Sequence, residues 1–336
     1  MLDIGLIGLG PEWDSRYRPA ILRQGGRVAV RALFTPVGSR AAAVCDEFEC
    51  ELAHSVSDLV SRPTVQAVVV LDSAWFSIAP VEFACRARKP VLLVDPVRTS
   101  QSSFDHLAHL ADDLGTMITP DLVHRYTPAT ARLRELMATK LGKPAHFQLE
   151  ISAQPGAGAG TVWSRFLSDT LAAAFDWCHS VSGAVPSQIS PVVGSTQSGR
   201  FQVDVQFAPF ADRSRPPTAR IGIRSPAGDG TSPNAPEGSP PAFVATVECQ
   251  RGRVLLHDAE HVIWSFEADE RDESLATERE AFDVLLDHFA RRVVGGLIPI
   301  ATLNEALRAR AWAAAARCAV DAGISMRLDR RTGNSE

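Results

Sequence analysis

Asp3-Ile4-Gly5-Leu6-Ile7-Gly8-Leu9-Gly10 opens the chain as a short apolar strand that runs into Gly-x-Gly. In a dinucleotide-binding fold, one glycine of this pattern makes the tight turn and the next lets a pyrophosphate approach the backbone. The third glycine of the usual fingerprint is replaced by Trp13. We therefore expect a Rossmann-type strand and turn, with Gly8 and Gly10 as cofactor-binding residues and a modified start to the following helix.

Apolar runs alternate with helical stretches through the first third of the chain, a pattern typical of a parallel sheet with crossover helices. The expected strands cover residues 4–8, 28–34, 67–71 and 91–94. The expected helices cover residues 17–24, 39–48, 56–59, 78–87 and 104–114. Right-handed crossovers bring the carboxyl ends of all these strands to one edge of the sheet, where we expect the ligand.

From about Lys143 the apolar residues recur with period two, which indicates strands with one polar and one apolar face. The expected strands cover residues 146–151, 201–207, 242–249, 253–257 and 261–266, with a turn near residues 251–252. Residues 211–241 are rich in Pro, Gly and Ser and are expected to form an excursion between strands. A capping box at residues 302–305 predicts the start of a C-terminal helix.

These patterns predict an α/β protein with two domains, as its 336 residues also suggest at roughly 150 residues per domain. Residues 1–121 should form a doubly wound parallel sheet of the Rossmann type that binds NAD(P). Residues 122–330 should form an α+β domain with an open-faced, mostly antiparallel sheet that serves substrate binding and oligomerisation. An open apolar sheet face would be exposed to solvent in a monomer, so we expect a homo-oligomer.

Composition excludes several partners and sites. A net charge of -5 and a pI near 6.0 give no basic surface for nucleic acid or for an anionic membrane. No apolar run approaches the roughly 18 residues of a membrane span, and the chain starts without a signal peptide, so a cytoplasmic location is expected. The six cysteines are scattered without a Cys-x-x-Cys pair, which predicts reduced thiols. His106 and His109 have helical ligand spacing, but no Glu or Cys cluster accompanies them, and no metal site is expected.

Three further stretches carry a family resemblance: residues 63–70 as a core strand, residues 123–128 with Arg-x-x-Pro, and residues 277–306 as closing helices. Together with the glycine turn, they resemble the glucose-fructose oxidoreductase and inositol dehydrogenase family (Gfo/Idh/MocA) over the full length. The resemblance implies an NAD- or NADP-binding domain followed by an open-faced sheet domain. It also implies a sugar- or cyclitol-like small-molecule substrate, held with the nicotinamide in a cleft between the domains.

The sequence departs from the family at the residues that the resemblance assigns to proton transfer. Asp95 stands where the family's Glu-Lys-Pro motif has its lysine. The family's Asp-x-x-x-His-x-x-Asp motif falls on Asp169, Ala173 and Asp176, so its histidine is lost while both acids remain. Asp169 and Asp176 would share one face of a helix, and with Asp95 they are the candidate catalytic residues. Positioned acids and bases usually contribute about 100- to 10,000-fold each, so turnover requires a replacement group.

Each candidate also has a plain structural interpretation, which stays open. Asp95 can be a solvated acid in a turn, and Asp169 and Asp176 can be capping or salt-bridging acids of their helix. His179 is the nearest substitute for the lost histidine, but it lies on a rotated face of that helix and can equally be a packing or surface residue.

Cofactor preference is indicated at the end of the second strand, where an acid usually accepts hydrogen bonds from the adenosine ribose. Thr35 occupies that place, and Arg40 and Ser39 follow closely. A guanidinium binds phosphate bidentately, so this segment favours NADP over NAD, if a dinucleotide binds at all. The alternative is a helix-starting Ser39 and a solvated Arg40. Ser73, where the family has a proline after its third strand, is a further candidate cofactor contact.

Two functions from different classes remain at this point. One is an NADP-linked oxidoreductase acting on a sugar-like alcohol or ketone, which rests on the family resemblance. The other is a non-catalytic ligand-binding or sensor protein on the same fold. It rests on Trp13, Ser77, Asp95 and Ala173, which concentrate the departures around one edge of the predicted cleft.

Overall fold

The computed structural model describes residues 1–94, 100–152, 161–192, 200–209, 215–224 and 242–328. The chain divides into two compact units. Unit 1 comprises residues 1–123 and 279–307, and unit 2 comprises residues 124–278 and 308–336. The segment 279–307 therefore returns to the first unit, and α10 (Leu303–Ala322) starts in unit 1 and continues in unit 2.

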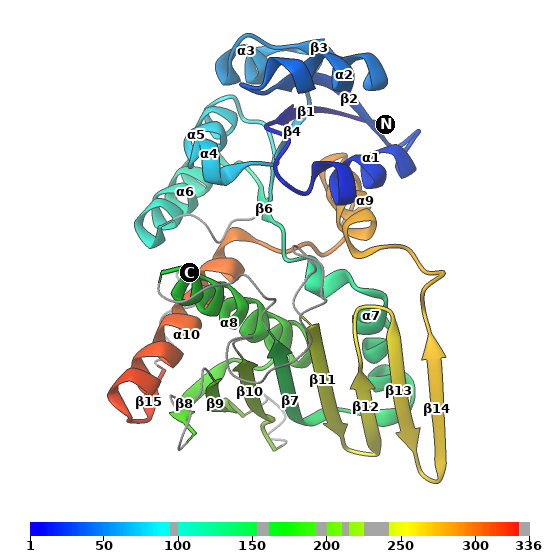
Figure 1. Cartoon of the computed structure of the whole chain (residues 1–336), viewed down its shortest axis with the longest axis vertical. Helices are drawn as coiled ribbons and strands as arrows, with labels where there is room; N and C mark the ends of the chain where they lie inside the picture. The colour runs from blue at the N-terminus through cyan, green and yellow to red at the C-terminus, as the bar shows by residue number, and fades with distance from the viewer. Residues whose placement is uncertain (95–99, 153–160, 193–199, 210–214, 225–241, 329–336) are drawn as a thin grey trace. The chain divides into compact units, whose positions relative to one another are not determined.

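Unit 1 is built on a six-stranded sheet with the order β3-β2-β1-β4-β5-β6, in which every neighbouring pair is parallel (Figure 1). Its strands are β1 (Leu2–Ile7), β2 (Val28–Phe34), β3 (Glu51–Leu52), β4 (Ala67–Val70), β5 (Val91–Leu93) and β6 (Ile118–Pro120). The strand order reverses between β1 and β4, and ligands of such sheets bind outside the carboxyl ends of the strands at that reversal. The glycine turn that follows β1 lies there.

The helices of unit 1 connect these strands, except for the last one, which lies in the returning segment 279–307. They are the π-helix η1 (Trp13–Tyr17), α1 (Arg18–Arg23), α2 (Gly38–Phe48), α3 (Val56–Ser61), α4 (Ser73–Phe76), α5 (Ala79–Arg86), α6 (Gln101–Leu114) and the returning α9 (Ala281–Val293). Arg23 fastens α9 to α1, because its Nε donates to Asp283 Oδ2 at 2.6 Å. The ring of Tyr17 also packs edge-on against Phe282, with 4.8 Å between the ring centroids.

Unit 2 contains a nine-stranded sheet with the order β14-β13-β12-β11-β7-β10-β9-β8-β15 (Figure 1). Its strands are β7 (Pro144–Ser152), β8 (Pro186–Pro191), β9 (Arg200–Phe207), β10 (Thr218–Arg224), β11 (Ala242–Cys249), β12 (Gly252–Leu256), β13 (His261–Phe266), β14 (Asp269–Ser274) and β15 (Met326–Arg327). Only β7 and β10 pair in parallel among the described strands of this sheet. The predicted fold class, a parallel sheet domain and a mostly antiparallel one, is confirmed.

Helical segments precede and cover this second sheet. They are η3 (Val123–Tyr126), which spans the boundary between the units, α7 (Pro128–Leu136), η4 (Met137–Leu141), α8 (Thr161–Ser182) and the second part of α10. The apolar residues of β7, such as Phe147 and Leu149, are fully buried in one core with residues of α7, α8 and α10.

The expectation that the apolar sheet face awaits another subunit is therefore wrong, because the helices of the same unit cover it. The opposite face carries charged pairs, among them Arg220 with Asp204 at 2.7 Å and Arg200 with Glu150 at 3.3 Å. An exposed apolar sheet face therefore no longer supports a homo-oligomer, which stays a prediction.

The expectation that residues 211–241 form only an excursion between strands is also wrong. Strand β10 (Thr218–Arg224) lies inside this segment, between β7 and β9. Its alternate residues Ala219, Ile221 and Ile223 are buried in the core. The period-two pattern of a strand is therefore present in the sequence, but it is short. Residues 225–241 lie outside the described part of the chain.

Two further expectations concern helices. The capping box is confirmed, since Thr302 Oγ1 accepts from the Glu305 N–H at 3.3 Å and Glu305 Oε2 accepts from the Thr302 N–H at 2.8 Å. Within the described residues, no helix combines the length and apolar character that crossing a bilayer requires.

Candidate functional site

The glycine turn after β1 is a close contact between two loops of unit 1. Gly8 and Gly10 both have positive φ, 72° and 64°, which other L-residues rarely adopt. A Cβ on Gly8 would lie 2.7 Å from Asp72 Cβ, and one on Gly10 would lie 2.5 Å from the Leu71 carbonyl oxygen. Both glycines are therefore required by the approach of the chain to its own β4 segment, whether or not a phosphate binds.

The backbone donors of this turn are only partly used. The Gly8 N–H donates to the Phe34 carbonyl at 2.8 Å. Among the described residues, the N–H groups of Leu9 and Gly10 enter no backbone hydrogen bond. The turn thus fits a pyrophosphate through backbone donors. Asp72 opposes that fit with its negative charge, part of which is engaged because Oδ1 accepts from the Trp75 N–H at 3.1 Å.

Trp13, which replaces the third glycine, is accommodated inside unit 1. Its side chain is only 1% exposed, and its ring packs edge-on against Phe48 at the end of α2, 6.0 Å between centroids. The residues after the turn start as a π-helix, η1, before α1 continues. The large ring therefore joins α2 to the segment that follows the turn.

The predicted 2′-phosphate contacts lie at the start of α2. Thr35 Oγ1 accepts from the Val37 N–H at 3.4 Å. The Arg40 guanidinium pairs with Asp14 at 3.0 Å, and both side chains are exposed. Exposed pairs of this kind contribute about 0–1 kcal/mol, so a phosphate group can displace the carboxylate. Ser73 begins α4, but its side chain lies outside what the structure describes.

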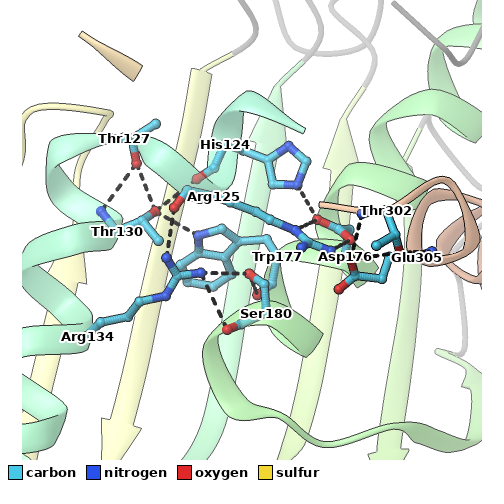
Figure 2. A network of polar contacts seen from close by, with 10 residues as sticks. All are labelled: His124, Arg125, Thr127, Thr130, Arg134, Asp176, Trp177, Ser180, Thr302 and Glu305. Atoms are coloured by element: carbon cyan, nitrogen blue, oxygen red, sulfur yellow. Dashed lines mark hydrogen bonds and ion pairs between the residues drawn. The ribbon is translucent and has the colours of Figure 1, made fainter. Parts of the chain in front are cut away.

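Unit 2 contains a buried polar network centred on Asp176, which is 1% exposed in the middle of α8 (Figure 2). Arg125 binds this carboxylate through two nitrogens, with Nε donating to Oδ2 at 2.7 Å and Nη2 donating to Oδ1. His124 Nε2 lies 2.8 Å from the same Oδ2. One carboxylate is thus paired with a buried cation and with an imidazole whose side chain is 24% exposed.

Helix α7 fixes the backbone of His124 and Arg125. Thr130 Oγ1 donates to the His124 carbonyl at 3.1 Å and accepts from the Trp177 indole N–H at 2.9 Å. Arg134 Nη1 donates to the Arg125 carbonyl at 2.9 Å (Figure 2). Both peptide carbonyls are therefore anchored, so the imidazole and the guanidinium meet Asp176 in a defined geometry.

The other predicted site residues are placed differently. Asp169 is partly buried on α8, and Ala173 lies one turn before Asp176. His179 Nδ1 lies 3.0 Å from the Ala184 carbonyl, which ties this ring to the end of its own helix. Asp95 lies outside the described residues.

His124 was not identified as a site residue from the sequence. It contacts a residue 52 positions away, and no local spacing rule connects the two. The available signal was its position beside Arg125, at the start of the linking segment. Among the described residues, no group of three or more His, Cys, Asp and Glu is arranged to hold a metal ion.

The charge state of Asp176 follows from its partners. Burial by itself raises the pKa of this carboxyl, but the hydrogen bonds and charges of Arg125 and His124 outweigh burial and hold the pKa at about 2. Asp176 is therefore ionised at neutral pH, and it acts as an acceptor only. Because it faces Oδ2, His124 Nε2 must carry a proton.

Because of this lowered pKa, the free energy of unfolding should depend on pH in the acidic range. The pKa of Asp176 falls from 3.8 to about 2 on folding, so its contribution is present above about pH 4 and is lost as the pH falls through 2. The full shift of nearly two pKa units corresponds to about 2.5 kcal/mol, of which about 2 kcal/mol is lost between pH 4 and pH 2. Urea titrations should show the unfolding free energy of the wild type dropping by that much more between pH 4 and pH 2 than that of Asp176→Asn. An equal drop in both proteins would contradict this origin.

Comparison with known proteins addresses the fold of both units. Residues 2–122 match the model of GFO_IDH_MocA, an oxidoreductase family with an NAD-binding Rossmann fold. The resemblance seen in the sequence is confirmed by this match and by similar solved structures. No curated protein matches the chain.

Solved structures extend the likeness beyond the GFO_IDH_MocA segment. A putative myo-inositol dehydrogenase from Sinorhizobium meliloti 1021 has a TM-score of 0.73 at 17% identity, covering 98% of this chain and 100% of that one. UDP-N-acetylglucosamine 3-dehydrogenase from Acidithiobacillus ferrooxidans has 0.71 at 19%, covering 96% and 98%. A super-repressor mutant of Gal80p from Saccharomyces cerevisiae has 0.76 at 12%, covering 100% of each chain. At these identities the likeness concerns the fold.

Proposed function

We propose that the chain is an NADP-linked oxidoreductase of a sugar- or cyclitol-like compound, in which His124 transfers the proton. In this proposal unit 1 binds the dinucleotide and unit 2 binds the substrate. The family match of residues 2–122 and the dehydrogenases among the similar structures support the reaction type. The observation that carries the proposal is the contact of His124 Nε2 with ionised Asp176 at 2.8 Å.

The hydrogen bond decides which nitrogen of His124 is reactive. Because Nε2–H donates to Asp176, a neutral ring has its lone pair on Nδ1. Within the described part of the chain, no hydrogen bond reaches Nδ1. The ring is also partly exposed, at 24%. Nδ1 can therefore accept a proton from a substrate hydroxyl, and the imidazolium that results is stabilised by the carboxylate behind it.

His124 supplies the group that Ala173 has removed. The resemblance places a proton-transferring histidine at position 173, one helical turn before Asp176. In this chain the imidazole instead comes from η3 and contacts the same helix at Asp176. Asp176 then acts as a positioning residue, while Asp169 and Asp95 remain candidates for contacts to substrate hydroxyls.

Cofactor binding in this proposal uses the residues predicted from the sequence. Gly8 and Gly10 shape the turn for the pyrophosphate, and Thr35 and Arg40 bind the 2′-phosphate. Ser73, which follows the end of β4 in the sequence, is a further proposed contact. NADP, when bound, supplies the hydride acceptor or donor. In the proposal, this phosphate replaces Asp14 as the ion-pair partner of Arg40.

Removing the guanidinium should reveal the cofactor preference. Arg40→Ala is expected to weaken NADP binding roughly 10- to 100-fold and to leave NAD binding unchanged, because a charged hydrogen bond contributes about 1.5–3 kcal/mol. Asp14→Asn should tighten NADP binding, since it removes the competing carboxylate. Calorimetry measures both constants. Arg31→Ala is the matched control, because Arg31 is a similarly exposed, ion-paired arginine of unit 1. Equal losses for NADP and NAD would contradict the assignment.

A non-catalytic ligand-binding protein is the second candidate. Ala173 and the acid Asp72 beside Gly8 favour it, because one removes a proton carrier and the other adds negative charge at the turn. The deciding experiment offers the protein NADP and NAD with a panel of sugars, cyclitols and their ketones, and follows nicotinamide absorbance. Turnover supports the oxidoreductase. Tight binding of a cofactor or sugar without turnover supports the second candidate.

A further inference from the structure

Two thiols meet where α2 ends. Cys45 lies in the last part of the helix, and Cys50 lies just beyond it. Glu49 between them adopts the left-handed conformation, with φ 50°, and the Cys50 N–H donates to the Cys45 carbonyl at 3.0 Å. This reversal of the backbone brings the two Sγ atoms to 3.6 Å from each other.

The backbone geometry is that of a helix-ending turn in which the two side chains at these positions usually form an apolar contact. Here both side chains are cysteines, and both are partly exposed to solvent. Cys85 and Cys178, in contrast, are buried. The pair therefore combines proximity with access for a small oxidant.

We propose that Cys45 and Cys50 form a redox-active dithiol, which closes into a disulfide on reaction with a peroxide. A disulfide requires the sulfurs to approach to about 2.05 Å, and side-chain rotation at a turn that already holds the two residues together supplies this movement. The site is independent of the proposed oxidoreductase activity.

The two sulfurs have different roles. Burial and the neighbouring Cys45 raise the pKa of the Cys50 thiol to about 12, and its proton points at Cys45 Sγ. Cys50 therefore stays protonated at neutral pH, and we assign the first attack to Cys45, whose Sγ accepts from the Cys50 thiol.

The reaction balances with one peroxide for each pair. The Cys45 thiolate attacks one oxygen of hydrogen peroxide, so an S–O bond forms, the O–O bond breaks, and the released hydroxide takes up a proton to become water. The Cys50 sulfur then attacks Cys45 Sγ, so the S–S bond forms and the S–O bond breaks. The hydroxyl leaves with the Cys50 proton as a second water. Two thiols are oxidised and one peroxide is reduced.

Mass spectrometry of the full chain tests this proposal. After one equivalent of peroxide, we expect the loss of two hydrogens, protection of Cys45 and Cys50 from iodoacetamide, and reversal by dithiothreitol. Cys318→Ser, which removes an exposed thiol elsewhere, should behave like the wild type. Cys50→Ser should instead accumulate a sulfenic acid at Cys45 that dimedone traps.

A probe that requires no oxidation provides a second measurement. Phenylarsine oxide should bind the wild type and Cys318→Ser at the dithiol, and it should lose that binding in Cys45→Ser and Cys50→Ser. Full alkylation of both thiols after peroxide would overturn the proposal. Disulfide formation by Cys45 with another cysteine in Cys50→Ser, at the wild-type rate, would also overturn it.

Discussion

His124→Asn should lower kcat by about 100- to 10,000-fold and leave the dissociation constant of NADP unchanged, because the imidazole is the proposed proton carrier and the proposed dinucleotide site lies in unit 1. The asparagine amide reaches only about as far as the Nδ1 position of the ring, so this variant also loses the contact of Nε2 with Asp176, while Arg125 remains a partner of that carboxylate. Steady-state kinetics with the substrate found in the panel, together with calorimetry of NADP, separates the two effects.

His179→Asn is the matched control. His179 is also an imidazole of unit 2, but it is tied to the Ala184 carbonyl at 3.0 Å and its ring packs against Trp312. We expect its kcat to stay within a few fold of the wild type. If His124→Asn kept the full kcat, the proton would travel through another group, and Asp169 would become the first residue to replace.

Arg125→Met should reduce the unfolding free energy by about 3–5 kcal/mol, because it leaves the buried Asp176 carboxylate without its cation. Arg125 is itself buried, and it contacts Asp176 through Nε and Nη2. Methionine fills much of the same volume, so the loss reports on charge more than on packing. Urea unfolding at neutral pH measures the difference.

Arg220→Met provides the comparison for that loss. Arg220 also binds a carboxylate through two nitrogens, to Asp204 at 2.7 and 2.9 Å, but both side chains are about half exposed. Exposed pairs contribute about 0–1 kcal/mol, so this variant should remain close to the wild type. Similar losses in the two variants would mean that burial of Asp176 adds nothing to its pairing.

Regular elements were the most predictable part of this fold. The predicted strand 28–34 coincides with β2, and the predicted turn near 251–252 lies between β11 and β12, because in both places a strong local pattern has clear ends. Strand β10 was missed because its three inward residues are surrounded by Pro, Gly and Ser. Such flanking residues are typical of a loop, but pairing with β7 on one side and β9 on the other makes this segment a strand.

The candidate site was less predictable for a different physical reason. Asp176 was identified from its motif, but its charge state depends on Arg125 and His124, about 50 residues earlier in the chain. Likewise, Arg40 was identified from its position after the second strand, while its partner Asp14 comes from another segment. Contacts between distant segments leave no periodic signal in the sequence.

The tight contact of Gly8 and Gly10 with the β4 segment has an evolutionary consequence. Since any side chain at either position would strike Asp72 or Leu71, replacing these glycines would harm folding even in a descendant that bound no nucleotide. Selection for a foldable chain alone would then preserve the most recognisable part of the nucleotide-binding signature. Lineages of this fold that turn to other tasks should therefore keep the signature long after the nucleotide has gone.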